Sequence, residues 1–152
     1  MFLLNAHKDR ILVSKSTALK IRYYLEGVRQ QLMAIPMFSI EKAGDIAIII
    51  PSPTAEKMAE DLMLTATDLV LDPLDKMKPS GLVFDLSEVD YVGSLFLGFL
   101  LRCHKRVKKH GCEVVIAGAS PNARELLHLT GLDTIWPIYN DRKEAIAALN
   151  SD

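Results

Sequence analysis

One stretch of the sequence, residues 82–120, constrains the fold more than any other. Two short apolar runs, at residues 82–86 and 114–117, flank an amphipathic stretch that opens at Gly93 and closes at Gly111. Apolar runs of this length are typical of buried strands, and the stretch between them is long enough for a helix. Strand, helix and strand in this order form a right-handed βαβ unit with parallel strands. We therefore expect an α/β domain.

Length and composition exclude several classes of protein. The 152 residues are enough for one domain, and 18 Lys or Arg against 19 Asp or Glu argue against a nucleic-acid partner. Two cysteines do not form a disulfide framework, and residues 1–10, with a four-residue apolar run, do not have the pattern of a signal peptide. The longest apolar-rich run, residues 91–101, covers about 11 positions, too few to span a bilayer. We expect a cytoplasmic protein without stable membrane insertion.

Residues 1–36 differ from the rest of the chain in charge and in pattern. Residues 1–35 carry six Lys or Arg but only Asp9 and Glu26. A helix over about residues 16–34, stopped by Pro36, is predicted by apolar side chains at spacings of three and four: Ile21, Leu25, Val28, Leu32 and Ile35. We treat residues 1–36 as an N-terminal helical extension and residues 37–152 as one domain.

The position of this predicted helix is open. It can pack on its own domain, form a homodimer contact, or lie on a membrane surface. The strands around Ile48 and Val115 look apolar on both sides, which calls for cover on both faces of their sheet. We therefore expect residues 16–34 to cover one face, from the same chain or from a second copy.

The other elements follow from turn and cap signals. Residues 37–41 and 45–50 suggest a β-hairpin, and Ser52–Pro53 suggests the start of a helix that runs to about Leu71, before a loop at Asp72–Pro73. The remaining predictions are a helix over residues 122–129, an edge strand over residues 135–139 and a helix over residues 142–149 capped by Asp141 with Glu144. The expected order is ββαβαβαβα after the N-terminal helix.

Motifs for phosphate or dinucleotide binding are missing from the sequence. No Gly-x-x-x-x-Gly-Lys-Ser/Thr loop is present, and Gly93 and Gly98 do not form a Gly-x-Gly-x-x-Gly fingerprint. An α/β order without these motifs argues against a nucleotide-binding enzyme. We expect a non-enzymatic protein with no cofactor.

Metal binding and nucleophilic catalysis are weak alternatives. Four residues lie close enough in sequence to consider zinc: Cys103, His104, His110 and Cys112. The helix periodicity places Cys103 in the core, so a buried thiol explains it better than a ligand. His104 lies three turns from Ser94 and on another side of the helix, which makes it a poor general base for that hydroxyl.

The second half of the same helix is strongly basic. Its cations are Arg102, Lys105, Arg106, Lys108 and Lys109, with no acid among them. Cations near a helix C-terminus complement the helix dipole and give a solvated face. Contact with an acidic partner is the alternative explanation.

Ser94 stands at the entrance to the helix and is the candidate regulatory residue. A serine after glycine at a strand-to-helix junction is expected to be the N-cap. The same geometry suits phosphorylation, because the added charge would lie beside backbone N–H groups and the positive end of the dipole. An apolar partner lying over the hydroxyl would not tolerate that charge.

Between about residue 37 and residue 149, several motifs follow one another in a characteristic order: residues 83–87 and 89–92, Ser94, residues 97–101, residues 120–127 and residues 130–133. On these motifs, the chain resembles the STAS family of sulfate-transporter and anti-sigma-factor-antagonist domains. The resemblance implies a mixed sheet with helices mainly on one face. In the bacterial antagonists, the loop and helix around a serine bind an anti-sigma factor that is also a serine kinase, and phosphorylation of the serine ends the capture.

Ser94 occupies the position of that serine. The resemblance therefore implies a partner-binding surface formed by Asp90, Tyr91, Gly93, Ser94, Leu95, Gly98 and Arg102, with no metal. The family motif Asp-Ser-Ser/Thr-Gly-Leu-Gly is altered here, since Gly93 replaces the acid, Leu95 the second hydroxyl and Phe96 the first glycine. The alternative function is a STAS interaction subunit of a transport or signalling assembly, without a phosphorylation switch.

Overall fold

The computed structural model describes residues 2–6, 9–34, 38–53, 55 and 60–151. The chain divides into two compact units, Met1–Pro36 and Met37–Asp152. In the first unit, strands β1 (Phe2–Ala6) and β2 (Asp9–Val13) pair antiparallel, and helix α1 (Lys15–Ala34) follows them. The N-terminal helix was predicted from its apolar periodicity, whereas the hairpin was not.

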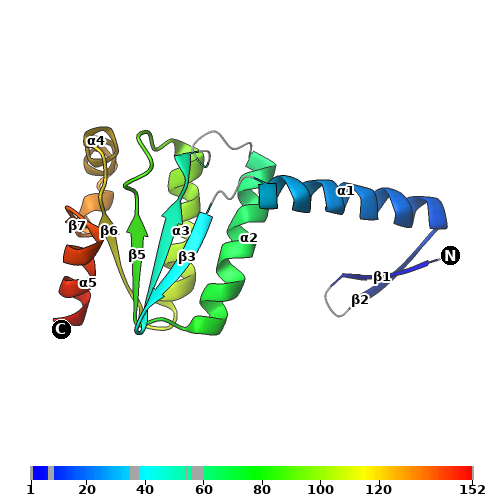
Figure 1. The fold of residues 1–152 in the computed structure, drawn as a ribbon, viewed down its shortest axis with the longest axis horizontal. Coiled ribbons are helices and arrows are strands. Elements are labelled where there is room, and N and C mark those ends of the chain that lie inside the picture. The colour runs from blue at the N-terminus through cyan, green and yellow to red at the C-terminus, as the bar shows by residue number, and fades with distance from the viewer. Residues whose placement is uncertain (1, 7–8, 35–37, 54, 56–59, 152) are drawn as a thin grey trace. The chain divides into compact units, whose positions relative to one another are not determined.

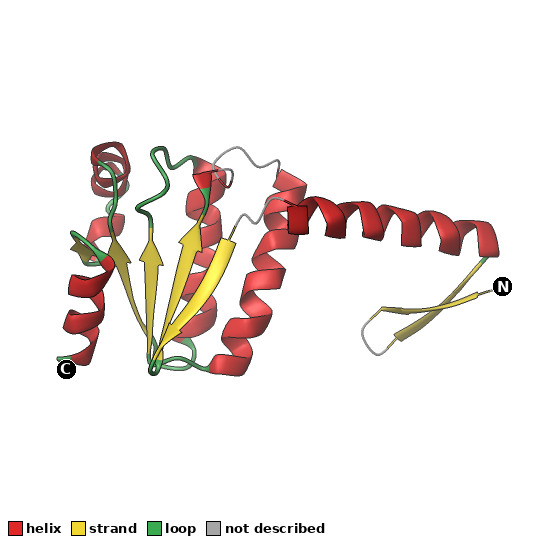
Figure 2. Ribbon diagram, viewed as in Figure 1, coloured by secondary structure: helices red, strands yellow, loops and turns green. Residues whose placement is uncertain are grey.

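The second unit is built on a five-stranded mixed sheet (Figure 2). Its strands lie in the order β3 (Phe38–Ala43), β4 (Ile46–Pro51), β5 (Gly81–Asp85), β6 (Glu113–Ala117) and β7 (Ile138–Tyr139). The β3–β4 pair is antiparallel and the other three pairs are parallel. The predicted α/β class and the central βαβ unit are confirmed, with β7 at the expected edge.

Helices α2 (Glu60–Met77) and α3 (Ser94–Lys108) pack against each other on one face of this sheet (Figure 1). The strand residues on this face that have no exposed surface include Ala47, Ile49, Leu82, Phe84 and Ile116. The Phe99 ring of α3 stacks on Phe38 of β3 at a centroid distance of 4.4 Å. Burial of this apolar surface fixes α3 on the sheet.

Helix α5 (Arg142–Asn150) covers the opposite face of the sheet. Ile48, Val83 and Val115 form a buried cluster there with Ala145 of α5. Gly81 lets the helix approach closely, because a Cβ at this position would lie 2.9 Å from a Leu149 methyl carbon. The strands are therefore apolar on both sides, as predicted, and α5 supplies cover on this face.

Helix α2 differs from the sequence prediction at its C-terminal end. It continues through Pro73 to Met77, where the sequence predicted a loop from Asp72. A proline inside a helix costs about 3 kcal/mol, and burial of Val70, Leu71 and Leu74 offsets that cost. At the predicted N-terminal end, the Ala55 N–H donates to the Ser52 carbonyl in a single turn, and residues 56–59 lie outside the described part.

The predicted strand over residues 135–139 is wrong in its first half. Helix α4 (Pro121–Leu129) ends at Gly131, which has a φ of 75°, and a short 3₁₀ turn over Leu132–Thr134 follows. The Trp136 N–H then donates to the Leu132 carbonyl, and the indole is fully buried against Phe84. These contacts leave Ile138–Tyr139 as the paired segment of β7.

Candidate docking site at the start of α3

The loop between β5 and α3 is anchored at both of its ends. Where β5 ends, the Ser87 N–H donates to Asp85 Oδ1 at 3.1 Å, and the Leu86 N–H donates to the Ala117 carbonyl at 2.9 Å. Farther along, Val89 and Val92 are each 1 % exposed and fix the loop in the core. The intervening polar residues are consequently presented to solvent on a rigid support.

The N-cap of α4 also holds this loop. The Ser120 hydroxyl accepts a hydrogen bond from the Ala123 N–H and donates to the Asp90 carbonyl at 2.8 Å. The Ser120 hydroxyl thereby caps α4 and also holds the loop that leads into α3. The sequence predicted the cap at Ser120, but not its second bond, since that bond joins residues 30 positions apart.

Ser94 is the first residue of α3, whereas the sequence predicted that it would be the N-cap, one position before the helix. Gly93 is the N-cap, with φ −95° and ψ 177°, and no side chain caps the helix. The Gly93 carbonyl accepts the Leu97 N–H at 3.0 Å, which places Ser94 inside the first turn. Its side chain is exposed. A hydroxyl here still lies beside the first N–H groups of the helix, which have no intrahelical acceptor.

The other predicted partner-binding residues lie along the same loop and the same helix. Asp90, Tyr91, Leu95 and Arg102 are exposed, and Gly93 and Gly98 are partly exposed. Tyr91 and Leu95 expose 62 % and 43 % of their surface, which is high for apolar side chains held on rigid elements. Ser94 therefore lies between two apolar groups that face solvent, as expected for a protein-docking surface.

A groove beside this surface was not predicted. It has a volume of about 370 Å³ and lies between the loop and α4, lined by Tyr91, Val92, Asn122, Glu125, Leu126 and Leu129. Leu129 is 74 % exposed at its rim. The sequence held one signal for it, because α4 has more leucines near its end than one buried face accommodates, and Leu127 is the buried one.

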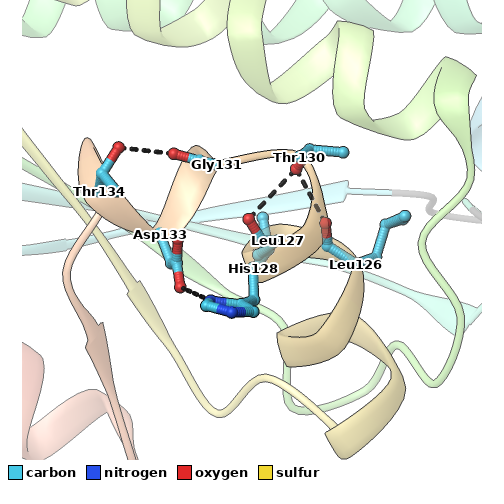
Figure 3. A network of polar contacts seen from close by, with 7 residues as sticks. All are labelled: Leu126, Leu127, His128, Thr130, Gly131, Asp133 and Thr134. Carbon is cyan, nitrogen blue, oxygen red and sulfur yellow. Dashed lines mark hydrogen bonds and ion pairs between the residues drawn. The ribbon is translucent and has the colours of Figure 1, made fainter.

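Polar contacts fix the end of α4 that lines the groove (Figure 3). The Thr130 hydroxyl bonds to the Leu126 carbonyl at 2.8 Å, and His128 Nδ1 lies 2.9 Å from Asp133 Oδ2. The Thr134 hydroxyl donates to the Gly131 carbonyl at 2.6 Å. His128 is largely exposed, so its contact with Asp133 adds little stability, and the hydroxyl bonds hold the turn.

The four residues considered for zinc do not converge. Burial raises the pKa of the Cys103 thiol to about 12 and that of Cys112 to about 11, which keeps both protonated. His104 Nδ1 accepts a hydrogen bond from the Trp136 indole at 3.0 Å, and His110 is exposed. In the part of the chain that the structure describes, no three His, Cys, Asp or Glu residues form a metal-binding group.

The STAS domain family model matches residues 50–145, which contain the loop, α3 and α4. This chain belongs to the STAS family. Its STAS domain is 32 % identical over 69 residues to BtrV of Bordetella bronchiseptica, which is named as a candidate anti-sigma factor antagonist. It is 29 % identical over 78 residues to the anti-sigma F factor antagonist of Paenibacillus polymyxa. The matches cover 45 % and 51 % of this chain, and 60 % and 67 % of those relatives.

The STAS fold also matches solved structures. An anti-sigma factor antagonist from Mycobacterium paratuberculosis superposes with a TM-score of 0.58 at 27 % identity. That match covers 74 % of this chain and 92 % of the other. Among the described residues, no helix is both long and apolar enough to cross a membrane.

Proposed function

We propose that this protein is an anti-sigma factor antagonist that captures an anti-sigma factor with serine kinase activity. Phosphorylation of Ser94 ends the capture. The observation that carries the proposal is the exposed Ser94 in the first turn of α3, flanked by the exposed apolar side chains of Tyr91 and Leu95. The named relatives support the same class of function.

The local physics suits a switch that acts on the partner and not on the fold. A phosphate on Ser94 would add nearly two negative charges beside free N–H groups and the positive end of α3. The domain itself is therefore not strained by the modification. A partner that buries Tyr91 and Leu95 would have to desolvate the phosphate, which is costly.

The probes for this function are the purified anti-sigma factors that are encoded in the same genome as this chain. Incubation of the full chain with the cognate factor and ATP should add one phosphate, located at Ser94 by mass spectrometry. Ser94→Asp should weaken capture about tenfold or more, corresponding to about 1.4 kcal/mol. Ser151→Asp, an exposed serine near the C-terminus, is the matched control and should bind as the wild type does. Capture that is unchanged by Ser94→Asp would falsify the switch.

A STAS interaction subunit without a switch is the second candidate. The altered motif favours it, because Phe96 is 1 % exposed and serves the core where the family motif has glycine. Stable co-purification with a transporter ATPase, together with no phosphate at Ser94, would decide for this function. Both candidates are non-enzymatic, and we assign both to the cytoplasm.

Residues 1–36 form a separate extension in this proposal, and residues 37–152 act as the STAS domain. The extension is the candidate for homodimer formation. Leu25 lies on the apolar stripe of α1 and is 57 % exposed, so its own unit does not cover it. A second copy of the same helix is a suitable cover for such a stripe.

A further inference from the structure

The solvent side of α3 continues well beyond Ser94. On this helix, Ser94, Gly98, Leu101, Arg102, Lys105 and Lys109 follow one another at spacings that keep them on one side. Leu101 is 40 % exposed among these polar neighbours. We define the cationic face as Arg102, Lys105, Lys108 and Lys109, all of which are exposed.

The charge of this face differs from that of its domain. Residues 37–152 contain twelve Lys or Arg against seventeen Asp or Glu, a net charge of −5, whereas α3 has no acidic residue. Arg106 pairs with Asp75 at 2.6 Å, but in the described part of the chain no ion pair involves the cationic face. A net-negative domain thus concentrates unpaired cations on one helix.

Stabilisation of α3 does not explain the whole face. Cations favour a helix C-terminus only within about the last turn. Lys105 and Lys108 satisfy that condition, whereas Arg102 lies farther from the end. Exposed Leu95 and Leu101 contribute nothing to the dipole or to solubility. Exposed leucines bordered by charged side chains on a rigid helix match the arrangement of a protein interface, which has an apolar centre and a polar rim.

We propose that the cationic face of α3 receives an acidic surface of the captured anti-sigma factor, with Leu95 and Leu101 contacting apolar side chains of that partner. The inference rests on the function proposed above and specifies the chemistry of its partner. An acidic protein surface fits better than nucleic acid or an anionic membrane, since the net charge of −5 on residues 37–152 opposes the approach of large polyanions to this domain.

This charge pattern gives the Ser94 switch its direction. Ser94 and Arg102 are eight residues apart, which separates them by about 12 Å along the helix. A phosphate on Ser94 is therefore beyond ion-pair distance of Arg102 and is not neutralised by it. It would place negative charge at one end of a face that binds an acidic surface, and would repel that surface.

Calorimetric titration with the anti-sigma factor identified above tests the proposal. The triple variant Arg102→Gln, Lys105→Gln and Lys109→Gln should weaken binding at least tenfold and should reduce the dependence of affinity on salt. The matched control is Lys42→Gln, Lys76→Gln and Lys143→Gln, which removes three exposed cations from other elements. The control should bind within about twofold of the wild type. Circular dichroism verifies that both triple variants fold.

Three results would overturn the inference. Equal binding by the two triple variants would show that the cationic face does not contact the anti-sigma factor. If the wild type still captures that factor, the proposed function is retained. The wild type and the α3 triple variant should also be tested with phosphatidylglycerol vesicles and duplex DNA at physiological salt. If only the wild type binds one of these tightly, the cationic face binds a membrane or a nucleic acid and not an acidic protein. No capture by the wild type would instead overturn the proposed function, and the inference with it.

Discussion

Arg142, the first residue of α5, joins two strands that are not neighbours in the sheet. Its guanidinium lies 2.9 Å from the Asp85 carboxylate at the end of β5 and 2.7 Å from Glu41 of β3. Asp85 is 4 % exposed, and its other oxygen accepts the Ser87 N–H at the start of the docking loop. The ion pair therefore fixes both α5 and the root of the candidate site.

Arg142→Met should destabilise the STAS domain by about 2 kcal/mol, because it leaves the buried Asp85 carboxylate without its cation. We expect less than for a fully buried pair, since Arg142 is about one-third exposed and solvent screens its charge. Urea unfolding followed by fluorescence of Trp136, the single tryptophan, measures the change within this unit. Lys143→Met, which alters the exposed neighbour, should change stability by less than about 0.5 kcal/mol. A similar loss in both variants would contradict the role given to the pair.

His104 should make the domain less stable in mild acid. Burial, and then the nearby Lys108, lower the pKa of His104, and its Nδ1 accepts the indole N–H only in the neutral form. The folded state thus binds the proton less readily than the unfolded state. The stability that neutral His104 contributes is fully present above the ordinary His pKa of about 6.5, and it declines as the pH falls below that value.

His104→Gln is the variant that isolates this effect, because its side-chain oxygen can accept the same indole hydrogen bond. Urea midpoints at pH 7 and pH 5, again followed by Trp136 fluorescence, should differ less for His104→Gln than for the wild type. His110→Gln replaces an exposed histidine of the same segment and should retain the wild-type dependence. The same pH dependence in all three proteins would disprove the assignment to His104.

The elements that local sequence patterns predict are those whose evidence lies within a few residues. The apolar strands, α3, the Ser120 cap and the Gly131 end of α4 belong to this group. At the Asp141 cap, the predicted capping box is changed in one bond, since Glu144 accepts from the Asn140 N–H and not from the cap itself. The donor is shifted by one residue, and sequence patterns do not locate helix ends more finely than that.

The features that were missed depend on residues far apart in sequence. Pro73 signals a loop by itself, but α2 continues through it and packs on α3. Residues 135–136 look like a strand until the indole of Trp136 is placed against Phe84 and His104. The groove needs Tyr91 and Leu129 side by side, which no spacing reveals. The β1–β2 hairpin was missed for a different, local reason, because residues 7–8 are His and Lys, which carry no turn signal.

Substitution of Gly98 should have opposite effects on the stability of the domain and on the capture of the anti-sigma factor. No atom lies within 4 Å of a Cβ built at this position, and glycine inside a helix costs about 1 kcal/mol relative to alanine. Gly98→Ala should therefore stabilise the domain in urea unfolding by about 0.5–1 kcal/mol. It should also weaken capture of the anti-sigma factor, if the partner's backbone approaches the helix here. A variant that is more stable and binds as well as the wild type would remove Gly98 from the docking surface.

A substitution on the apolar stripe of α1 should prevent dimer formation without unfolding the chain. Leu25 and Leu19 are similarly exposed, at 57 % and 55 %, but lie about 120° apart around the helix, and only Leu25 belongs to the stripe. Sedimentation velocity of the full chain should show a dimer for the wild type and for Leu19→Glu, and a monomer for Leu25→Glu. Because neither leucine is buried in its own unit, circular dichroism should be unchanged in both variants. A wild-type monomer, or a dimer that survives Leu25→Glu, would exclude this stripe as the contact.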